Sequence, residues 1–168
     1  MISDIINDMI ILVDTRENKN KHIEDYFDSK NIKWNRTKLD TADYTFILPN
    51  YSELNLNRKI LIERKGSLDE VAGNFTSGRE RFKREFERVN NEKIHIVMEN
   101  ATWTKILNGS YRSKFTPRAY IASLITWNIR YKCPIWFCTK KESGEIIYNL
   151  MRYELVEQIK NLDNLVKM

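Results

Sequence analysis

The sequence predicts a three-layer α/β domain in which helices cover both faces of a central mixed β-sheet. Short apolar runs that end in charged residues alternate with longer amphipathic segments, and such segments stand both before and after the central runs. Only 5 residues are glycine and 3 are proline, so no stretch has the composition of a linker. We therefore expect residues 1–168 to form a single domain.

Six stretches have the apolar runs or the alternation that are typical of β-strands. They are residues 9–13, 32–39, 44–48, 59–63, 93–98 and 134–138. Residues 40–43 (Asp-Thr-Ala-Asp) form a turn signal, which predicts that the second and third stretches pair with each other in antiparallel fashion. The polar stretch 49–58 is expected to be a loop, and 93–98 is expected to lie inside the sheet.

Six further segments have helical spacing or begin with residues that start helices. They are residues 19–30, 67–72, 79–90, 102–107, 117–131 and 145–166, the last of them after a turn at 143–144. Asn18 is expected to cap the first, and Ser67 with Glu70 has the spacing of a capping box. Pro117 after Thr116 is typical of a first helical turn.

The charge of the chain is modest in total but uneven in its distribution. The net charge is +5 and the pI is about 9.1, yet residues 100–141 contain no aspartate or glutamate. The basic residues of this segment are Lys105, Arg112, Lys114, Arg118, Arg130, Lys132, Lys140 and Lys141. Such a field favours a polyanionic partner, and nucleic acid is the one we expect.

Targeting signals and cysteine usage bear on the compartment. No apolar run is long enough to span a bilayer, and residues 1–8 lack the basic start and apolar centre of a secretory signal. We therefore expect an intracellular protein that does not bind membranes. Cys133 and Cys138 do not have the spacing of a zinc site, and a reducing compartment disfavours a disulfide, so we interpret both as core residues.

Residues 59–65 (Lys-Ile-Leu-Ile-Glu-Arg-Lys) are an apolar strand that ends abruptly in charge. Because side chains alternate along a strand, Glu63 and Lys65 share one face while Arg64 points to the other. Asp43 stands at the tip of a neighbouring predicted strand, and we expect this group near one edge of the sheet. Carboxylates that hold a divalent cation beside a lysine are what a metal-dependent phosphodiester hydrolase requires.

Further acids and bases stand close to the same predicted strand ends. Asp14 and Glu17 follow the first strand, and Asp69 follows the Glu-Arg-Lys sequence. Folding would gather like charges that repel one another unless a cation lies among them. Arg79 and Arg81 begin a predicted helix, where free backbone N–H groups already favour a phosphate.

Three ordered segments carry these charges. They are residues 13–17 (Val-Asp-Thr-Arg-Glu), 39–44 (Leu-Asp-Thr-Ala-Asp-Tyr) and 62–69 (Ile-Glu-Arg-Lys-Gly-Ser-Leu-Asp), and residues 77–79 (Ser-Gly-Arg) follow. Together they resemble the boxes of the XPF-type structure-specific endonucleases, over about residues 10–140. Two positions depart from that family's pattern. Ala42 replaces a glycine, which is tolerated if its φ is negative, and Ser77 replaces the aspartate of an Asp-Gly-Arg segment.

The resemblance implies a restriction-endonuclease-like fold and an endonuclease of DNA repair or recombination that uses Mg²⁺ or Mn²⁺. The implied metal ligands are Asp43, Glu63, Glu17 and Asp14, the implied catalytic residues are Glu63, Lys65, Asp43 and Asp69, and the residues expected to contact DNA are Arg16, Arg64, Arg79, Arg81, Lys114 and Arg118. Lys65 would act on the attacking water or the scissile phosphate, and Asp69 would position that lysine or a basic neighbour. The backbone carbonyl of Arg64 would also face the metal.

The resemblance leaves substrate and assembly open. The DNA is expected to be branched, flapped or duplex. We expect no tandem helix-hairpin-helix domain, so selectivity would come from residues 100–141, from a homodimer through the C-terminal helix, or from a partner protein. Compact nucleases of this kind resemble those encoded by phages and mobile elements. Two alternatives remain: a catalytically silent DNA-binding subunit of a nuclease complex, and a Holliday-junction-resolving or restriction-like nuclease.

Overall fold

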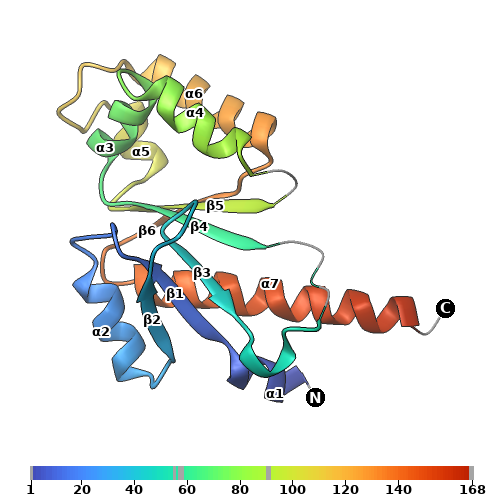
Figure 1. Cartoon of the computed structure of the whole chain (residues 1–168). Coiled ribbons are helices and arrows are strands. Elements are labelled where there is room, and N and C mark those ends of the chain that lie inside the picture. The colour runs from blue at the N-terminus through green and yellow to red at the C-terminus, as the bar shows by residue number, and fades with distance from the viewer. Residues whose placement is uncertain (1, 55, 57–58, 90–91, 167–168) are drawn as a thin grey trace.

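The computed structural model describes residues 2–54, 56, 59–89 and 92–166, and these form one mixed sheet with helices on both faces (Figure 1). The strands are β1 (Ile10–Asp14), β2 (Trp34–Thr37), β3 (Tyr44–Ile47), β4 (Ile60–Lys65), β5 (Lys93–Glu99) and β6 (Ile135–Cys138). Their order across the sheet is β2-β1-β3-β4-β5-β6. The predicted three-layer α/β class is confirmed, and the strand over 93–98 lies inside the sheet as expected.

All of the helices below except the first form at or near the positions that caps and periodicity predict. They are α1 (Ile2–Asp8), α2 (Lys21–Ser29), α3 (Leu68–Phe75), α4 (Arg79–Glu87), α5 (Trp103–Leu107), α6 (Pro117–Tyr131) and α7 (Ser143–Val166), with a 3₁₀ turn η1 (Pro49–Tyr51) in the predicted loop. The Ser67 hydroxyl accepts a hydrogen bond from the Glu70 N–H, as a capping box requires. Asn18 caps no helix, because α2 begins later. The predicted ends at residues 58 and 90 lie outside the described residues.

Two helix starts differ from the prediction, one because of packing and one because its sequence pattern is short. The predicted turn at 143–144 is already the first turn of α7. A Cβ at Gly144 would lie 2.7 Å from the Cβ of Tyr26 on α2, so glycine here allows the two helices to approach closely. Helix α1 was not predicted, because only Ile5 and Asp8 of its seven residues are buried and so short a pattern carries little periodicity.

The pairing predicted for the second strand is wrong. Residues 32–39 do not form a hairpin with β3; instead β2 pairs in parallel with β1, while β3 pairs antiparallel with β1 and with β4. Helix α2 connects β1 to β2 as a strand-helix-strand unit, and this crossover makes the parallel pairing possible. The turn at 40–43 then carries the chain across to the other side of β1.

Each face of the sheet has its own apolar core. One core joins β1, β3 and β4 to α1, α2 and α7, and the other joins β4 and β5 to α3, α4, α5 and α6 (Figure 1). Helix α7 buries Ile147, Met151 and Leu155 in the first core. This apolar stripe is therefore used within the chain. Cys133 and Cys138 are buried free thiols, as interpreted.

The strand directions bring several loops to one end of the sheet. Because β3 runs antiparallel between β1 and β4, the carboxyl ends of β1 and β4 lie beside the amino end of β3. The segment after Asp14, the residue Asp43 and the Glu63–Lys65 sequence therefore meet. We expected this group near an edge of the sheet, but β3 and β4 are its two middle strands. Among the described residues, no helix is long and apolar enough to cross a membrane.

Ala42 has a φ of 67°, so the negative φ that would tolerate a side chain there is absent. The left-handed conformation is costly for alanine and not for glycine, and we expect Ala42→Gly to stabilise the protein by about 0.5–1 kcal/mol net of glycine's extra chain entropy. Urea unfolding with an unchanged m value measures the gain. The exposed helical Ala122→Gly is the control and should lose about 1 kcal/mol. A lower free energy of unfolding in both variants would contradict backbone strain at Ala42.

Candidate functional site

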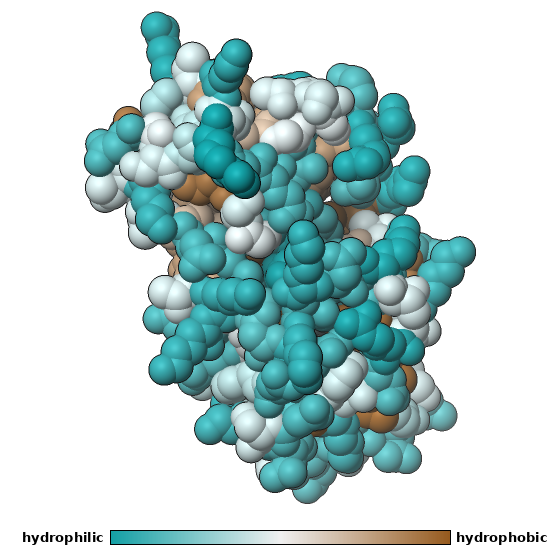
Figure 2. Space-filling view, turned by 90° about the vertical axis from the view of Figure 1, so that its left-hand side faces the viewer, coloured by the Kyte–Doolittle hydropathy of each residue, from teal (hydrophilic) through white to brown (hydrophobic). Residues whose placement is uncertain are grey.

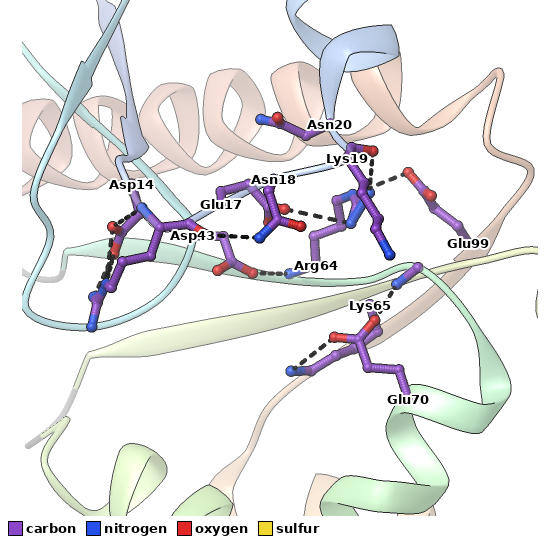
Figure 3. A network of polar contacts seen from close by, with 12 residues as sticks. Asp14, Glu17, Asn18, Lys19, Asn20, Asp43, Arg64, Lys65, Glu70 and Glu99 are labelled. Atoms are coloured by element: carbon purple, nitrogen blue, oxygen red, sulfur yellow. Dashed lines mark hydrogen bonds and ion pairs between the residues drawn. The ribbon is translucent and has the colours of Figure 1, made fainter.

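Glu17, Asp43 and Glu63 come together at this end of the sheet, where all three line a pocket of about 650 Å³. Figure 3 shows Glu17 and Asp43 with Arg64 and Lys65. The segment between β1 and α2 supplies Glu17, the start of β3 supplies Asp43, and the end of β4 supplies Glu63. Lys65 and Arg64 line the same pocket. The structure thus gathers three of the four acids expected to bind metal.

Asp43 is held rigidly at the centre of the group. Its N–H donates to the carbonyl of Ile62 at 2.9 Å, and its carbonyl accepts from the N–H of Asp14 at 2.8 Å. Its carboxylate accepts a hydrogen bond of 2.7 Å from the backbone N–H of Arg64. Burial, with the nearby charges of Glu63 and Glu17, raises the pKa of Asp43 well above its usual value. Ionisation of Asp43 is therefore unfavourable unless a positive charge lies close to its carboxylate.

Glu63 and Lys65 lie side by side, as the alternation along β4 predicts. The Lys65 Nζ lies 2.8 Å from a carboxylate oxygen of Glu63 and 3.8 Å from one of Glu70. It also lies 5.1 Å from the ring centroid of Phe82, and the residue is only 6% exposed. Burial alone would lower the pKa of Lys65, but the charge of Glu63 reverses this effect and raises it. Lys65 is thus a buried ammonium held at a carboxylate.

Arg64 points to the opposite face of β4 and is buried. Its Nε donates to Glu99 at 3.2 Å, its Nη2 donates to the Lys19 carbonyl at 3.0 Å, and its Nη1 lies 3.6 Å from Glu17. Only 7% of its surface is exposed. The expectation that the Arg64 side chain contacts DNA stays a prediction; in this structure three neighbouring groups hold the side chain inside the protein.

Asp14 does not join the carboxylate group. It is 2% exposed, and its carboxylate accepts hydrogen bonds from the N–H of Arg16 at 2.9 Å and from the Arg16 Nε at 3.1 Å. The same arginine donates to the carbonyl of Leu39 at 2.6 Å. Asp14 is absent from the lining of the pocket, while Arg16 lines it with a side chain that is 64% exposed. The expectation that Asp14 binds metal stays a prediction, and in this structure the carboxylate is paired with Arg16. The exposed part of the Arg16 side chain lines the pocket.

Asp69 holds a loop rather than Lys65. Its Oδ1 accepts hydrogen bonds from the N–H groups of Arg112 and Ser113 at 2.8 and 2.7 Å. Its Oδ2 lies 3.5 Å from the exposed Arg112 side chain. Asp69 was expected to position Lys65 or a basic neighbour, and the basic residue that it contacts here is Arg112. The carboxylate joins the start of α3 to the basic loop between α5 and α6, and the acids near Lys65 are Glu63 and Glu70.

The other predicted DNA contacts lie outside the pocket. Arg79 begins α4, donates to the Phe75 carbonyl at 3.3 Å and lies 5.8 Å from the Trp127 ring centroid, so its charge is partly engaged. Arg81, Lys114 and Arg118 are exposed, and none of them lines the pocket. Lys114 follows Ser113 in the loop, and the Ser113 N–H donates a hydrogen bond to Asp69.

Several residues of the pocket were not predicted. They are Asn18, Lys19, Glu70, Glu99, Asn100 and Lys140. Glu99 has the signal that identified Glu63, since it is an acid at the end of an apolar strand. The Nε2 of His22 lies 2.6 Å from a carboxylate oxygen of Glu99. No signal in the sequence around His22 indicated that it would lie near the site.

The chemistry of the site fits a hard divalent cation, although its carboxylates are paired with cationic side chains in this structure. In the part of the chain that the structure describes, no three His, Cys, Asp or Glu side chains are arranged to hold a metal ion as they stand. Glu17 faces Arg64 and Glu63 faces Lys65. Three carboxylates nevertheless offer only oxygen ligands, and the pKa of Glu17, like that of Asp43, is raised by burial and by neighbouring acids. A cation would relieve this repulsion once Glu17 and Glu63 turn inward.

Comparisons with known proteins identify the family. A family model described as the ERCC4 domain matches residues 13–150. The chain belongs to the ERCC4 domain family. It is thus an XPF-type nuclease domain, as the three sequence boxes predicted. A search of the curated proteins finds no match.

Solved structures of XPF have the same fold as this ERCC4 domain. XPF from Aeropyrum pernix matches with a TM-score of 0.60 and 19% identity, over 85% of this chain and 65% of that one. XPF from Aeropyrum pernix in complex with DNA matches with a TM-score of 0.64 and 19% identity, over 86% and 64%. The chain therefore spans just under two thirds of these chains. The expected restriction-endonuclease-like fold is confirmed.

Proposed function

We propose that this ERCC4 domain is a Mg²⁺- or Mn²⁺-dependent endonuclease that hydrolyses phosphodiester bonds in branched, flapped or duplex DNA. The observation that carries the proposal is the group formed by Asp43, Glu17 and Glu63 beside the buried ammonium of Lys65. Acids that repel one another in a pocket are costly for folding, and a cation-dependent reaction accounts for them. The family membership supports the same reaction class.

Asp43, Glu63 and Glu17 would hold the metal. Asp43 is already rigid, whereas Glu17 and Glu63 each exchange a cationic side chain for the ion. When bound, the metal supplies charge stabilisation at the phosphate and a water of lowered pKa. Its remaining positions are left for water and phosphate oxygens, as Mg²⁺ prefers.

Lys65 acts on the reacting groups from the wall of the pocket. If Glu63 held the metal, the Lys65 ammonium would lose the hydrogen-bond partner that now lies at 2.8 Å. It would then be available to donate to the attacking water or to a phosphate oxygen, which would orient the water or offset the charge that develops on the phosphate. Arg16, with its exposed side chain, contacts the DNA backbone at the rim.

The basic segment 100–141 would hold the DNA outside the pocket. One of the solved structures of similar fold is an XPF in complex with DNA. The face that carries the loops before α2 and α3 is largely hydrophilic (Figure 2), and Lys114 and Arg118 are exposed near α6. Asp69 holds the backbone of the loop that includes Lys114, and Arg118 lies in the first turn of α6. Phosphate contacts of this kind supply affinity without reading the base sequence.

Replacing Lys114 and Arg118 together by alanine should weaken DNA binding equally for all sequences. Loss of two phosphate contacts should reduce the slope of log affinity against log salt by about 2. Fluorescence anisotropy over a KCl series, with EDTA present, measures this slope. Lys30 and Lys33, at the opposite end of the sheet, are the control pair and should leave it unchanged. An unaltered slope in the Lys114 and Arg118 variant would show that the DNA does not contact these two residues.

A cleavage panel tests the proposed function itself. The purified chain is incubated with Mg²⁺ or Mn²⁺ and with flap, fork, four-way-junction and plain duplex DNA. Cleavage that requires the metal supports the proposal, and the preferred substrate separates an XPF-type nuclease from a junction-resolving or restriction-like enzyme. Metal-independent DNA binding without any cleavage would instead identify a catalytically silent subunit.

A further inference from the structure

Glu99 anchors a buried charge network that runs through Arg64 to Glu17 (Figure 3). It ends β5 and is 2% exposed. One of its carboxylate oxygens accepts a hydrogen bond from the Arg64 Nε at 3.2 Å and lies 2.6 Å from the His22 Nε2. A buried carboxylate needs partners of this kind, because its desolvation is otherwise expensive. Glu99 is therefore fixed from two sides, by α2 and by β4.

Arg64 is held more closely behind the site than in front of it. Its Nε and Nη2 make hydrogen bonds of 3.2 and 3.0 Å to Glu99 and to the Lys19 carbonyl, whereas its Nη1 lies 3.6 Å from Glu17. The guanidinium thus stands between two acids with one positive charge. Glu17 has the weaker geometry, because it lies 3.6 Å from the guanidinium. It can leave the guanidinium without leaving that cation unpaired.

We propose that Glu99 is a positioning residue for the metal site, which keeps the charge of Arg64 satisfied so that Glu17 is free to take up the cation. This inference rests on the proposed function, because it concerns the same carboxylates. Without the charge of Glu99, Arg64 would have Glu17 as its remaining acidic partner among the contacts described above. The arginine would then compete with the metal, and His22 would no longer have a carboxylate to orient.

Mn²⁺ binding measured by calorimetry without DNA tests the inference. Glu99→Gln keeps the shape of the side chain and removes its charge, so we expect the Kd for Mn²⁺ to rise by roughly tenfold, as for other residues that support metal ligands. Glu99→Asp keeps the charge, and we expect a smaller rise. A purely packing role predicts the reverse order, because glutamine is the better match in shape. Glu154→Gln is the control, because Glu154 pairs with Lys93 and His95 away from the pocket. The Kd of this variant for Mn²⁺ should equal that of the wild type.

A double variant adds a second readout. Arg64→Met with Glu99→Gln removes both the competing cation and its anchor, so its affinity for Mn²⁺ should exceed that of Glu99→Gln alone. An unchanged Kd in folded Glu99→Gln, or a greater loss in Glu99→Asp, would overturn the inference while wild-type cleavage keeps the proposed function. If Glu99→Gln does not fold, the comparison of Glu99→Asp with Glu154→Gln decides, and equal Kd values overturn the inference. Wild-type protein that neither binds Mn²⁺ nor cleaves DNA overturns both.

Discussion

Replacing Asp43 by asparagine is expected to abolish DNA cleavage, by at least about 10³-fold, while the protein stays folded. The new side chain retains an oxygen that can accept the hydrogen bond from the Arg64 N–H, now 2.7 Å from the carboxylate. It loses the negative charge and one of the two carboxylate oxygens that we propose bind the metal. A factor of this size corresponds to about 4 kcal/mol, which is reasonable for a directly bound metal ligand.

The same substitution should not lower stability in the absence of metal. The raised pKa of Asp43, caused by burial and by Glu63 and Glu17, means that its ionised form is unfavourable in the folded protein. A neutral asparagine removes this repulsion, so the Tm in EDTA should equal or exceed that of the wild type. Added Mn²⁺ should raise the Tm of the wild type and leave that of the variant almost unchanged.

Cleavage rates and thermal unfolding with and without Mn²⁺ check both expectations. The exposed Asp40→Asn, only three positions earlier, is the control and should behave as the wild type. An Asp43→Asn protein that still cuts DNA at the wild-type rate would remove the basis of the proposed function. A variant that has lost activity because it unfolds would instead show that Asp43 is structural.

Replacing Lys65 by methionine should reduce cleavage by about 10²–10⁴-fold without loss of metal binding. Methionine has a similar length and can pack against Phe82, over which the ammonium now lies at 5.1 Å. The group that donates to water or phosphate is gone. Glu63 also loses its 2.8 Å partner, so it should bind Mn²⁺ at least as tightly as before. The stabilisation of the variant by Mn²⁺ should therefore exceed that of the wild type, from a lower starting Tm.

Single-turnover cleavage and Mn²⁺ calorimetry separate these effects. Lys93→Met is a matched control, because Lys93 also pairs with a partly buried acid, Glu154, but does so away from the pocket. It should lose stability and keep its cleavage rate. A Lys65→Met variant that loses Mn²⁺ binding together with activity would show that the lysine supports the metal ligands rather than the reaction.

Local signals explain why many elements could be predicted. Helix α6 runs from Pro117 to Tyr131 as expected, because the cap at Thr116 and the proline act within one turn of chain. The Ser67 cap is equally local. The side-by-side placement of Glu63 and Lys65 follows from the two-residue period of a strand. Such features depend on neighbours in sequence, so the sequence suffices.

Features that depend on distant partners were missed or predicted wrongly. The parallel partner of β2 is β1, across the α2 crossover, and no local signal distinguishes it from a hairpin. The positive φ of Ala42 follows from the hydrogen bonds that hold Asp43 between β1 and β4. Asp14 and Asp69 have the right residue type and the right position in the boxes, yet Arg16 and the loop at Arg112 bind their carboxylates.

The residues of the sequence were enough to indicate a mixed α/β domain, its nuclease family and the core of the site at Asp43, Glu63 and Lys65, because these depend on period, capping and ordered motifs. The tertiary structure decided which acids meet and what each one binds. Arg64 is the clearest case: its sequence position suggested DNA, and its burial against Glu99 assigns it to the interior. A side chain's role depends on the charges that the fold places around it, and here the deciding charge lies 35 positions further along the chain.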